Sequence, residues 1–273
     1  MKLWFRSDKH GWFKRDYRLA KTNDLGTGTG IVLLHGIGSS GHVWDPLIKQ
    51  LQRQPFKCRV VTYDLLGFGK SPKPADIEYT VDDQATAVIG MIKRLRRSKP
   101  VVLVGHSMGS LVAVRVAKLR PDLVRHLVLY EMPLYDGLPD KRRYQTRVKL
   151  YFNFFEWITR QNPDFKAVRK RFKERIATHI VGSELTAKSW QPFIKSLQNT
   201  IMQQSAAKDL PTLTMPADII YGTRDMLVIR GKVHHIFGLD SDLVTTHTIR
   251  ERHVISTKSS KFISDRITAA LGA

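Results

Sequence analysis

Short apolar runs recur along the chain and alternate with longer segments of helical character. The runs occupy residues 31–34, 60–63, 101–104, 127–130 and 219–221. A parallel strand that is buried on both faces reads as such a continuous apolar run, and alternating strands and helices build a parallel sheet with helices on its two faces. The pattern therefore predicts an α/β fold with a mostly parallel central sheet.

The segments between and around these runs predict the remaining elements of the core. Residues 81–97 and 107–119 carry apolar side chains at helical spacing, and residues 259–271 predict a closing helix. The residues before 19 predict an antiparallel hairpin at the sheet edge. Residues 26–30 predict a glycine-rich turn that leads into a strand.

The recurring strand-like apolar runs are absent from the sequence between residues 133 and 210. The sequence there is helical in pattern and rich in aromatic and basic residues, and strand-like runs return only after it. This segment predicts a helical cap inserted into the sheet domain. The predicted boundaries are 1–132 together with 211–273 for the core and 133–210 for the cap.

The most specific local signal is the sequence Gly105-His106-Ser107-Met108-Gly109, which lies between an apolar strand and a helix. A strand that reverses sharply into a helix forces the central residue into a strained backbone, and only small flanking residues leave room for that turn. The turn exposes the Ser107 hydroxyl at the carboxyl edge of the sheet, beside a helix amino terminus that favours negative charge. Ser107 is therefore the candidate nucleophile.

With this Gly-x-Ser-x-Gly turn, the chain resembles the α/β-hydrolase family. Two further segments support the resemblance: residues 35–40, His-Gly-Ile-Gly-Ser-Ser, follow a strand where the family has its oxyanion loop, and residues 64–71 match the family's Asp-x-x-Gly-x-Gly-x-Ser turn. The resemblance implies that the backbone N–H groups of Ile37 and Met108 form the oxyanion hole. It covers the chain from about residue 31 to the end.

Three polar residues near these turns are expected to be structural. His35 and His106 are expected to support the turns by hydrogen bonding. Asp64 opens a turn whose glycines permit tight backbone geometry, so we expect that turn to be architectural.

A serine needs an adjacent base and an orienting carboxylate, and the family places them downstream in the order acid, then histidine. Asp225 follows the strand at 217–221 and so lies at the same sheet edge as Ser107, whereas Asp218 begins that strand at the opposite edge. His253 lies in the loop after the last strand, which is the family position for the base. His247, inside the strand at 243–249, is the alternative. No glycine directly precedes His253, which departs from the usual family pattern.

The formal net charge is +21, which predicts attraction to anionic partners. Residues 165–176 predict a basic amphipathic helix, either a cap helix with a solvated basic face or a surface that binds anionic lipid or acidic substrate. Nucleic acid is disfavoured as a partner because no nucleic-acid-binding motif accompanies the charge.

The single cysteine, Cys58, predicts a buried strand thiol, and the chain shows neither a signal-peptide core nor a membrane-spanning run. These features favour the cytoplasm, with peripheral membrane contact as an alternative.

Together the motifs predict a serine hydrolase that cleaves a carboxylic ester through an acyl-enzyme on Ser107, with His253 as general base and Asp225 as the orienting acid. No metal or organic cofactor is required for this chemistry. The same triad also serves carbon–carbon bond hydrolases, cofactor-free peroxidases, thioesterases and acyltransferases. A ligand receptor that does not turn over and a membrane-binding protein are the alternatives from other classes. The natural substrate and the oligomeric state stay open.

Overall fold

The computed structural model describes residues 17–54, 57–95, 99–134, 153, 155–166, 168, 184–225 and 242–272. Almost all of the predicted N-terminal hairpin and most of the predicted basic helix at 165–176 lie outside the described residues. The elements along the chain are β1 (Lys21–Gly26), β2 (Thr29–Leu34), η1 (Gly41–Trp44), α1 (Asp45–Leu51), β3 (Cys58–Tyr63), α2 (Val81–Leu95), β4 (Val101–His106), α3 (Met108–Leu119), η2 (Pro121–Leu123), β5 (Val124–Tyr130), η3 (Ala187–Ser189), α7 (Trp190–Ser196), η4 (Leu197–Met202), α8 (Ala206–Asp209), η5 (Leu210–Thr212), β6 (Ala217–Gly222), β7 (Val244–Ile249) and α10 (Thr257–Leu271).

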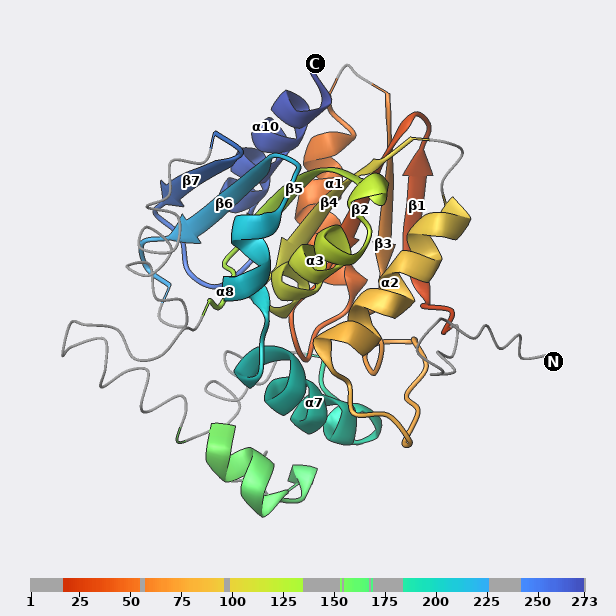
Figure 1. Ribbon diagram of the computed structural model, residues 1–273, viewed down its shortest axis with the longest axis vertical. Helices are drawn as coiled ribbons and strands as arrows, with labels where there is room; N and C mark the ends of the chain where they lie inside the picture. The colour runs from red at the N-terminus through yellow and green to blue at the C-terminus, as the bar shows by residue number, and fades with distance from the viewer. Residues whose placement is uncertain are drawn as a thin grey trace.

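The strands of the described residues form one seven-stranded sheet in the order β1-β3-β2-β4-β5-β6-β7 (Figure 1). Every neighbouring pair is parallel except β1 with β3. Each predicted apolar run lies in one of the parallel strands. The prediction of a mostly parallel α/β sheet is therefore confirmed.

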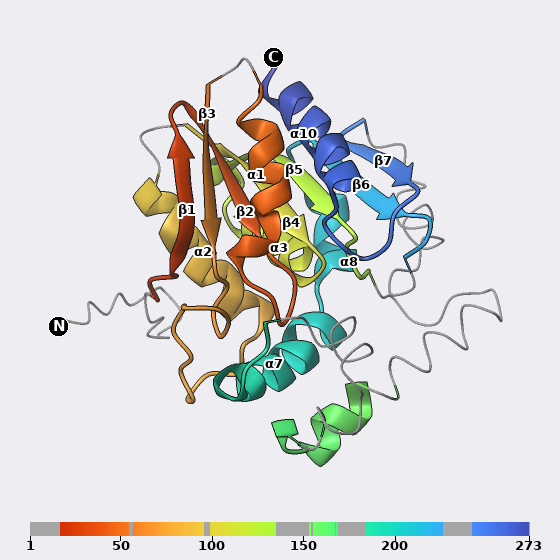
Figure 2. The same ribbon diagram turned by 180° about the vertical axis from the view of Figure 1, so that it is seen from behind.

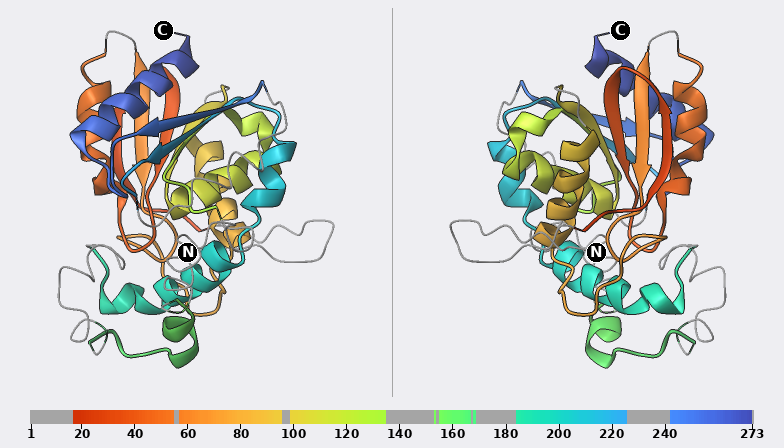
Figure 3. Two further views of the ribbon diagram at one scale, coloured as in Figure 1. Left: turned by 90° about the vertical axis from the view of Figure 1, so that its left-hand side faces the viewer. Right: turned by 90° about the vertical axis from the view of Figure 1, so that its right-hand side faces the viewer.

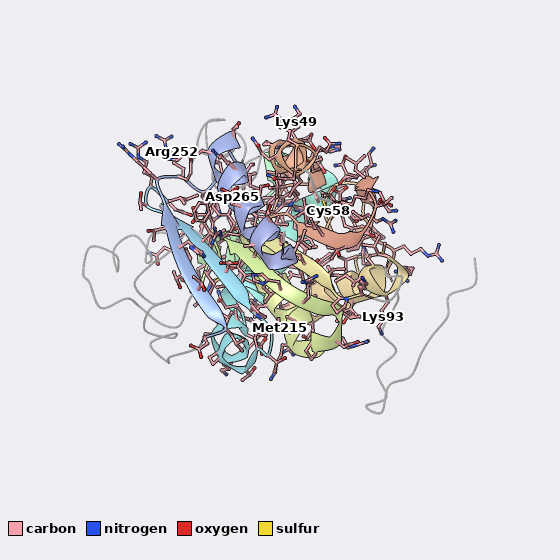
Figure 4. All side chains as sticks on the ribbon, turned by 90° about the horizontal axis from the view of Figure 1, so that it is seen from above. Lys49, Cys58, Lys93, Met215, Arg252 and Asp265 are labelled. Carbon is pink, nitrogen blue, oxygen red and sulfur yellow. The ribbon has the colours of Figure 1, made fainter. Side chains whose placement is uncertain are left out.

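The sheet has an apolar core on each face, because successive side chains of a strand point to opposite sides. In β2, Ile31 and Leu33 belong to a cluster with α1 and α10, whereas Val32 and Leu34 belong to a cluster with α2 and α3. Figure 3 shows these two pairs of helices on opposite sides of the sheet. Cys58 is buried, as predicted, in the apolar cluster on the face of the sheet that α1 and α10 cover (Figure 4).

The antiparallel edge strand β1 was not predicted as a strand. Its sequence, Lys-Thr-Asn-Asp-Leu-Gly, is polar because the strand is half-exposed at the sheet edge, where Asp24 pairs with Arg59 of β3. Gly26 and Gly28 have positive φ angles of 78° and 106°; a Cβ on Gly26 would collide with the carbonyl of Cys58, and one on Gly28 with that of Lys57. The glycine-rich turn therefore lets the chain pass close to the start of β3, so that β2 pairs on its far side.

The connection between β5 and β6 includes α7, which lies beyond the carboxyl ends of the parallel strands (Figures 1 and 2). Its described residues contain helices and no strand. It packs on the loop after β3: the Thr200 hydroxyl donates to the carbonyl of Tyr79 at 2.8 Å, and Lys195 Nζ donates to the carbonyl of Ile77 at 2.8 Å. No helix in the described part of the chain is long and apolar enough to cross a lipid bilayer.

Candidate active site

The three predicted triad residues follow the ends of β4, β6 and β7. These strands are parallel, so their carboxyl ends share one edge of the sheet; the arrowheads of β6 and β7 point toward that edge in Figure 2. Ligands of open α/β sheets bind outside this edge. The topology therefore gathers Ser107, Asp225 and His253 from distant parts of the chain.

Ser107 occupies the strained backbone that the sequence predicts, with φ 52° and ψ −122°. A Cβ at Gly105 would collide with the backbone of Gly109 and Ser110, and a Cβ at Gly109 would collide with the carbonyls at the end of β2. The Ser107 N–H donates to the carbonyl of Tyr130 at 2.9 Å, which fixes the turn against β5. Because these neighbours leave no room for another side chain, the glycines determine the sharp turn at Ser107.

Asp225 and His253 form a hydrogen-bonded pair, with 2.6 Å between Asp225 Oδ2 and His253 Nδ1. The Asp225 side chain is fully buried and that of His253 is 16% exposed. The Tyr130 hydroxyl lies 3.3 Å from the carbonyl oxygen of Arg252 and 3.0 Å from that of Val254, so it holds the loop on both sides of His253. This tyrosine anchors a loop that lacks the family's glycine.

Within the described residues, no hydrogen bond joins Ser107 to His253. The structure does place the His253 ring against His106, the residue before Ser107, with 5.0 Å between ring centroids. The arrangement brings His253, the predicted base, to the elbow that carries Ser107.

The two histidines beside the elbow differ in role. His35 Nε2 accepts the N–H of Leu65 at 2.8 Å, which confirms its predicted support of a turn. The prediction of a hydrogen-bonded His106 is wrong: neither ring nitrogen has a partner in the described part of the chain. Its ring instead stacks on Tyr130 and meets the edge of Trp44. Burial, followed by the nearby His253, holds the pKa of His106 well below its ordinary value, so the ring is neutral.

The Asp64 turn is architectural, as predicted. Its carboxylate accepts the N–H of Gly41 at 2.8 Å and the N–H of Lys70 at 2.7 Å. The Ser71 hydroxyl donates to the Asp64 carbonyl at 2.6 Å. These bonds join the turn to the loop after β2 and leave the Asp64 carboxylate engaged with the backbone.

The predicted oxyanion-hole residues approach the elbow from two sides. Met108 opens α3, so its N–H is one of those with no acceptor inside the helix. Ile37 lies in the turn after β2, and a Cβ on the preceding Gly36 would come within 3.2 Å of Ser107 Cβ. The residue before Ile37 therefore comes close to the Ser107 side chain, and Met108 follows Ser107 directly.

The alternative base, His247, is bonded elsewhere. Its Nε2 lies 2.5 Å from Oδ1 of Asp218, and His126 Nε2 lies 2.8 Å from Oδ2 of the same carboxylate. The His247 ring also contacts Phe262 of α10. Of the two candidate histidines, His253 bonds Asp225, whereas His247 bonds Asp218.

One residue of the site was missed by the sequence interpretation. Glu131 follows β5 directly, is fully buried and has a φ of 51°. A carboxylate oxygen of Glu131, a carboxylate oxygen of Asp225 and a ring nitrogen of His253 all lie within 4.8 Å of one another. A charged residue immediately after the apolar run at 127–130, at the same edge as Asp225, was the available signal. Such atoms also suit a divalent cation, but the Asp225–His253 hydrogen bond engages two of them.

Comparisons with known proteins agree with this architecture. A family model described as the alpha/beta hydrolase fold matches residues 30–236. A pimeloyl-(acyl-carrier protein) methyl ester esterase of Pseudoalteromonas atlantica is 31% identical over 230 residues, which cover 81% of this chain and 80% of that protein. A 2-(acetamidomethylene)succinate hydrolase of Mesorhizobium japonicum is 28% identical over 216 residues, covering 77% of this chain and 72% of that protein.

Among solved structures, a thermophilic esterase from Thermogutta terrifontis, with malate bound, has a TM-score of 0.68 at 22% identity, covering 94% of this chain and 93% of that chain. At this identity the likeness concerns the fold. The family match, together with the parallel sheet and the serine elbow, shows that this chain belongs to the alpha/beta hydrolase family.

Proposed function

We propose that the protein is a serine hydrolase that cleaves carboxylic esters through an acyl-enzyme on Ser107. The observation that carries the proposal is the 2.6 Å hydrogen bond between buried Asp225 and His253, at the sheet edge where Ser107 has its strained backbone. A nucleophile turn, a base and an orienting acid at one edge are the parts that acyl transfer requires.

In the proposed reaction the Ser107 Oγ attacks the ester carbonyl carbon while His253 accepts the hydroxyl proton. Asp225 keeps the proton-bearing Nδ1 of His253 directed towards itself and stabilises the imidazolium that forms. The imidazolium then gives its proton to the leaving alcohol, and an acyl-enzyme remains. Water, deprotonated by His253, then attacks the acyl carbon; as the bond to Ser107 Oγ breaks, His253 returns that proton to Oγ, which releases the acid and regenerates Ser107.

The negative oxygen of the tetrahedral intermediate requires hydrogen-bond donors. The N–H groups of Ile37 and Met108 serve this purpose in our proposal, since Met108 follows Ser107 directly and the residue before Ile37 comes close to the Ser107 side chain. Loss of one such donor typically raises the barrier by about 3–4 kcal/mol. No cofactor takes part in these steps.

The substrate in this proposal is a small ester that enters beneath the segment 133–210, which acts as a cap. The relatives named above act, by their names, on a methyl ester and on a succinate derivative. The net charge of +21 favours anionic substrates by raising their local concentration. The single buried cysteine agrees with a cytoplasmic site of action.

A fluorophosphonate probe tests the proposal, because an activated serine attacks phosphorus as it attacks a carbonyl. We expect peptide mapping to find the label on Ser107, and Ser107→Ala to lose both the label and the hydrolysis of nitrophenyl esters. Ser110→Ala is the matched control: Ser110 is buried in the same turn, and its hydroxyl bonds the carbonyls of Gly105 and Tyr130. Labelling of another serine, or of none in folded protein, would refute the proposal.

A further inference from the structure

Glu131 is held in a conformation that a glutamate rarely adopts. Its φ of 51° lies in the left-handed region, where the side chain crowds the backbone. Its side chain is also fully buried, although an ionised carboxylate loses the solvation of water there. Strained backbone of this kind persists where the surroundings over-determine it, and it concentrates at functional sites.

The contacts of Glu131 join the ends of two neighbouring strands. Its N–H donates to the carbonyl of Ile220 at 2.9 Å, and its Oε1 accepts the N–H of Gly222 at 2.7 Å. A Cβ at Gly222 would collide with that carboxylate oxygen, so the glycine makes room for it. Gly222 in turn bonds Asp225, whose N–H donates to the Gly222 carbonyl at 3.1 Å. Glu131 is therefore fixed beside the turn that carries Asp225.

This position brings a second carboxylate to His253. One carboxylate oxygen of Glu131, one of Asp225 and a ring nitrogen of His253 lie within 4.8 Å of one another. Among the described residues, the other titratable or charged groups around Glu131 and His253 are His106, Tyr130, Tyr221, Glu251, Arg224 and Arg252. Both arginines are exposed and Glu251 is half-buried, so solvent screens them more than it screens Glu131.

We propose that Glu131 is a positioning residue for the base: together with Asp225 it stabilises the imidazolium of His253 that forms when Ser107 loses its proton. This inference rests on the proposed function, since it assigns Glu131 a part in that reaction. An opposite charge within about 4–6 Å favours the charged form of a titratable group. The low exposure of the site keeps that effect from being screened.

Glu131→Gln tests the charge alone, because the amide oxygen can still accept the N–H of Gly222. Without the negative charge, His253 binds its proton less tightly and stays unprotonated to lower pH. We therefore expect the acid limb of the plot of kcat/KM against pH to shift to lower pH by about one unit. The plateau value of kcat/KM should fall about tenfold. Glu251→Gln, the control in the same loop, should leave the limb in place.

A second variant measures the same effect from the other side. Removal of the triad acid typically lowers kcat on the order of 10⁴-fold. With Glu131 still present, Asp225→Asn should lower kcat only about 10²-fold. The double variant Asp225→Asn/Glu131→Gln should lower kcat by the full factor on the order of 10⁴. Circular dichroism checks the fold of each variant. A full loss in Asp225→Asn alone would overturn the inference even if Glu131→Gln failed to fold.

A titration without substrate separates this inference from the proposed function. The carbon-bound ring protons of His253, assigned by their loss in His253→Gln, report its protonation by NMR in wild type and in Glu131→Gln. A downward shift in the variant supports the role of Glu131 whether or not the wild type hydrolyses esters. Identical titrations would overturn that role and leave the serine hydrolase proposal intact.

Discussion

At the scale of single residues, the site depends on which groups converge at His253. Asp225 bonds its Nδ1, and Tyr130 holds the backbone on both sides of it. His106 packs against its ring while staying neutral. Each of these contacts restricts the imidazole to one orientation, as a general base needs.

The assignment of the base is tested by comparing two histidines. His253→Ala removes the proton acceptor and should lower kcat/KM by a factor on the order of 10⁴ or more. His247→Ala should change kcat/KM less than about threefold, because His247 bonds Asp218 rather than Asp225. Both are measured with a nitrophenyl ester below the unfolding temperature. An inactive His247 variant beside an active His253 variant would reverse the assignment.

At the scale of elements, a second polar cluster joins β5, β6 and β7. His126, Asp218 and His247 come from one strand each, and both histidines bond the same carboxylate. The His247 ring also contacts Phe262 of α10. The cluster therefore ties the edge of the sheet to the helix that covers it.

Asp218→Asn tests the stabilising effect of this cluster. Burial acts to raise the pKa of Asp218, but its hydrogen bonds with His126 and His247 outweigh burial, so the net pKa is lowered. A carboxylate whose pKa is lower in the folded state stabilises the fold above its unfolded pKa and loses that effect as the pH falls through the folded value. At pH 7 the free energy of unfolding of the variant should be about 1–3 kcal/mol lower than that of the wild type.

The difference between wild type and Asp218→Asn should disappear in strong acid, below the ordinary value of 3.8. Urea unfolding at a series of pH values measures it. A difference that stays constant from neutral pH into strong acid would show that the carboxylate charge does not stabilise the cluster.

At the scale of the whole molecule, the net charge of +21 dominates the long-range field. We expect kcat/KM for a carboxylate-bearing ester to fall as salt is raised from 0.02 to about 0.5 M, since screening shortens the Debye length below about 10 Å. A neutral ester of the same shape should respond less than about twofold. Equal salt dependence of the two esters would contradict capture of anionic substrates by charge.

Much of the architecture follows from local sequence. The apolar runs predict the parallel strands, and the small residues around Ser107 predict the elbow, because burial and turn geometry act on neighbouring residues. Strand direction placed Asp225 at the Ser107 edge, and the family resemblance placed His253 in the loop after the last strand. The division into core and cap, and the catalytic roles, stay predictions.

The tertiary structure decided what depends on contacts between distant segments. Strand β1 is polar and gains its place only by pairing with β3. Glu131 becomes part of the site because β5 lies next to β6, and His106 is enclosed by rings from other elements. Local sequence records which residues are apolar, small or charged, whereas strand order and register determine which of them meet.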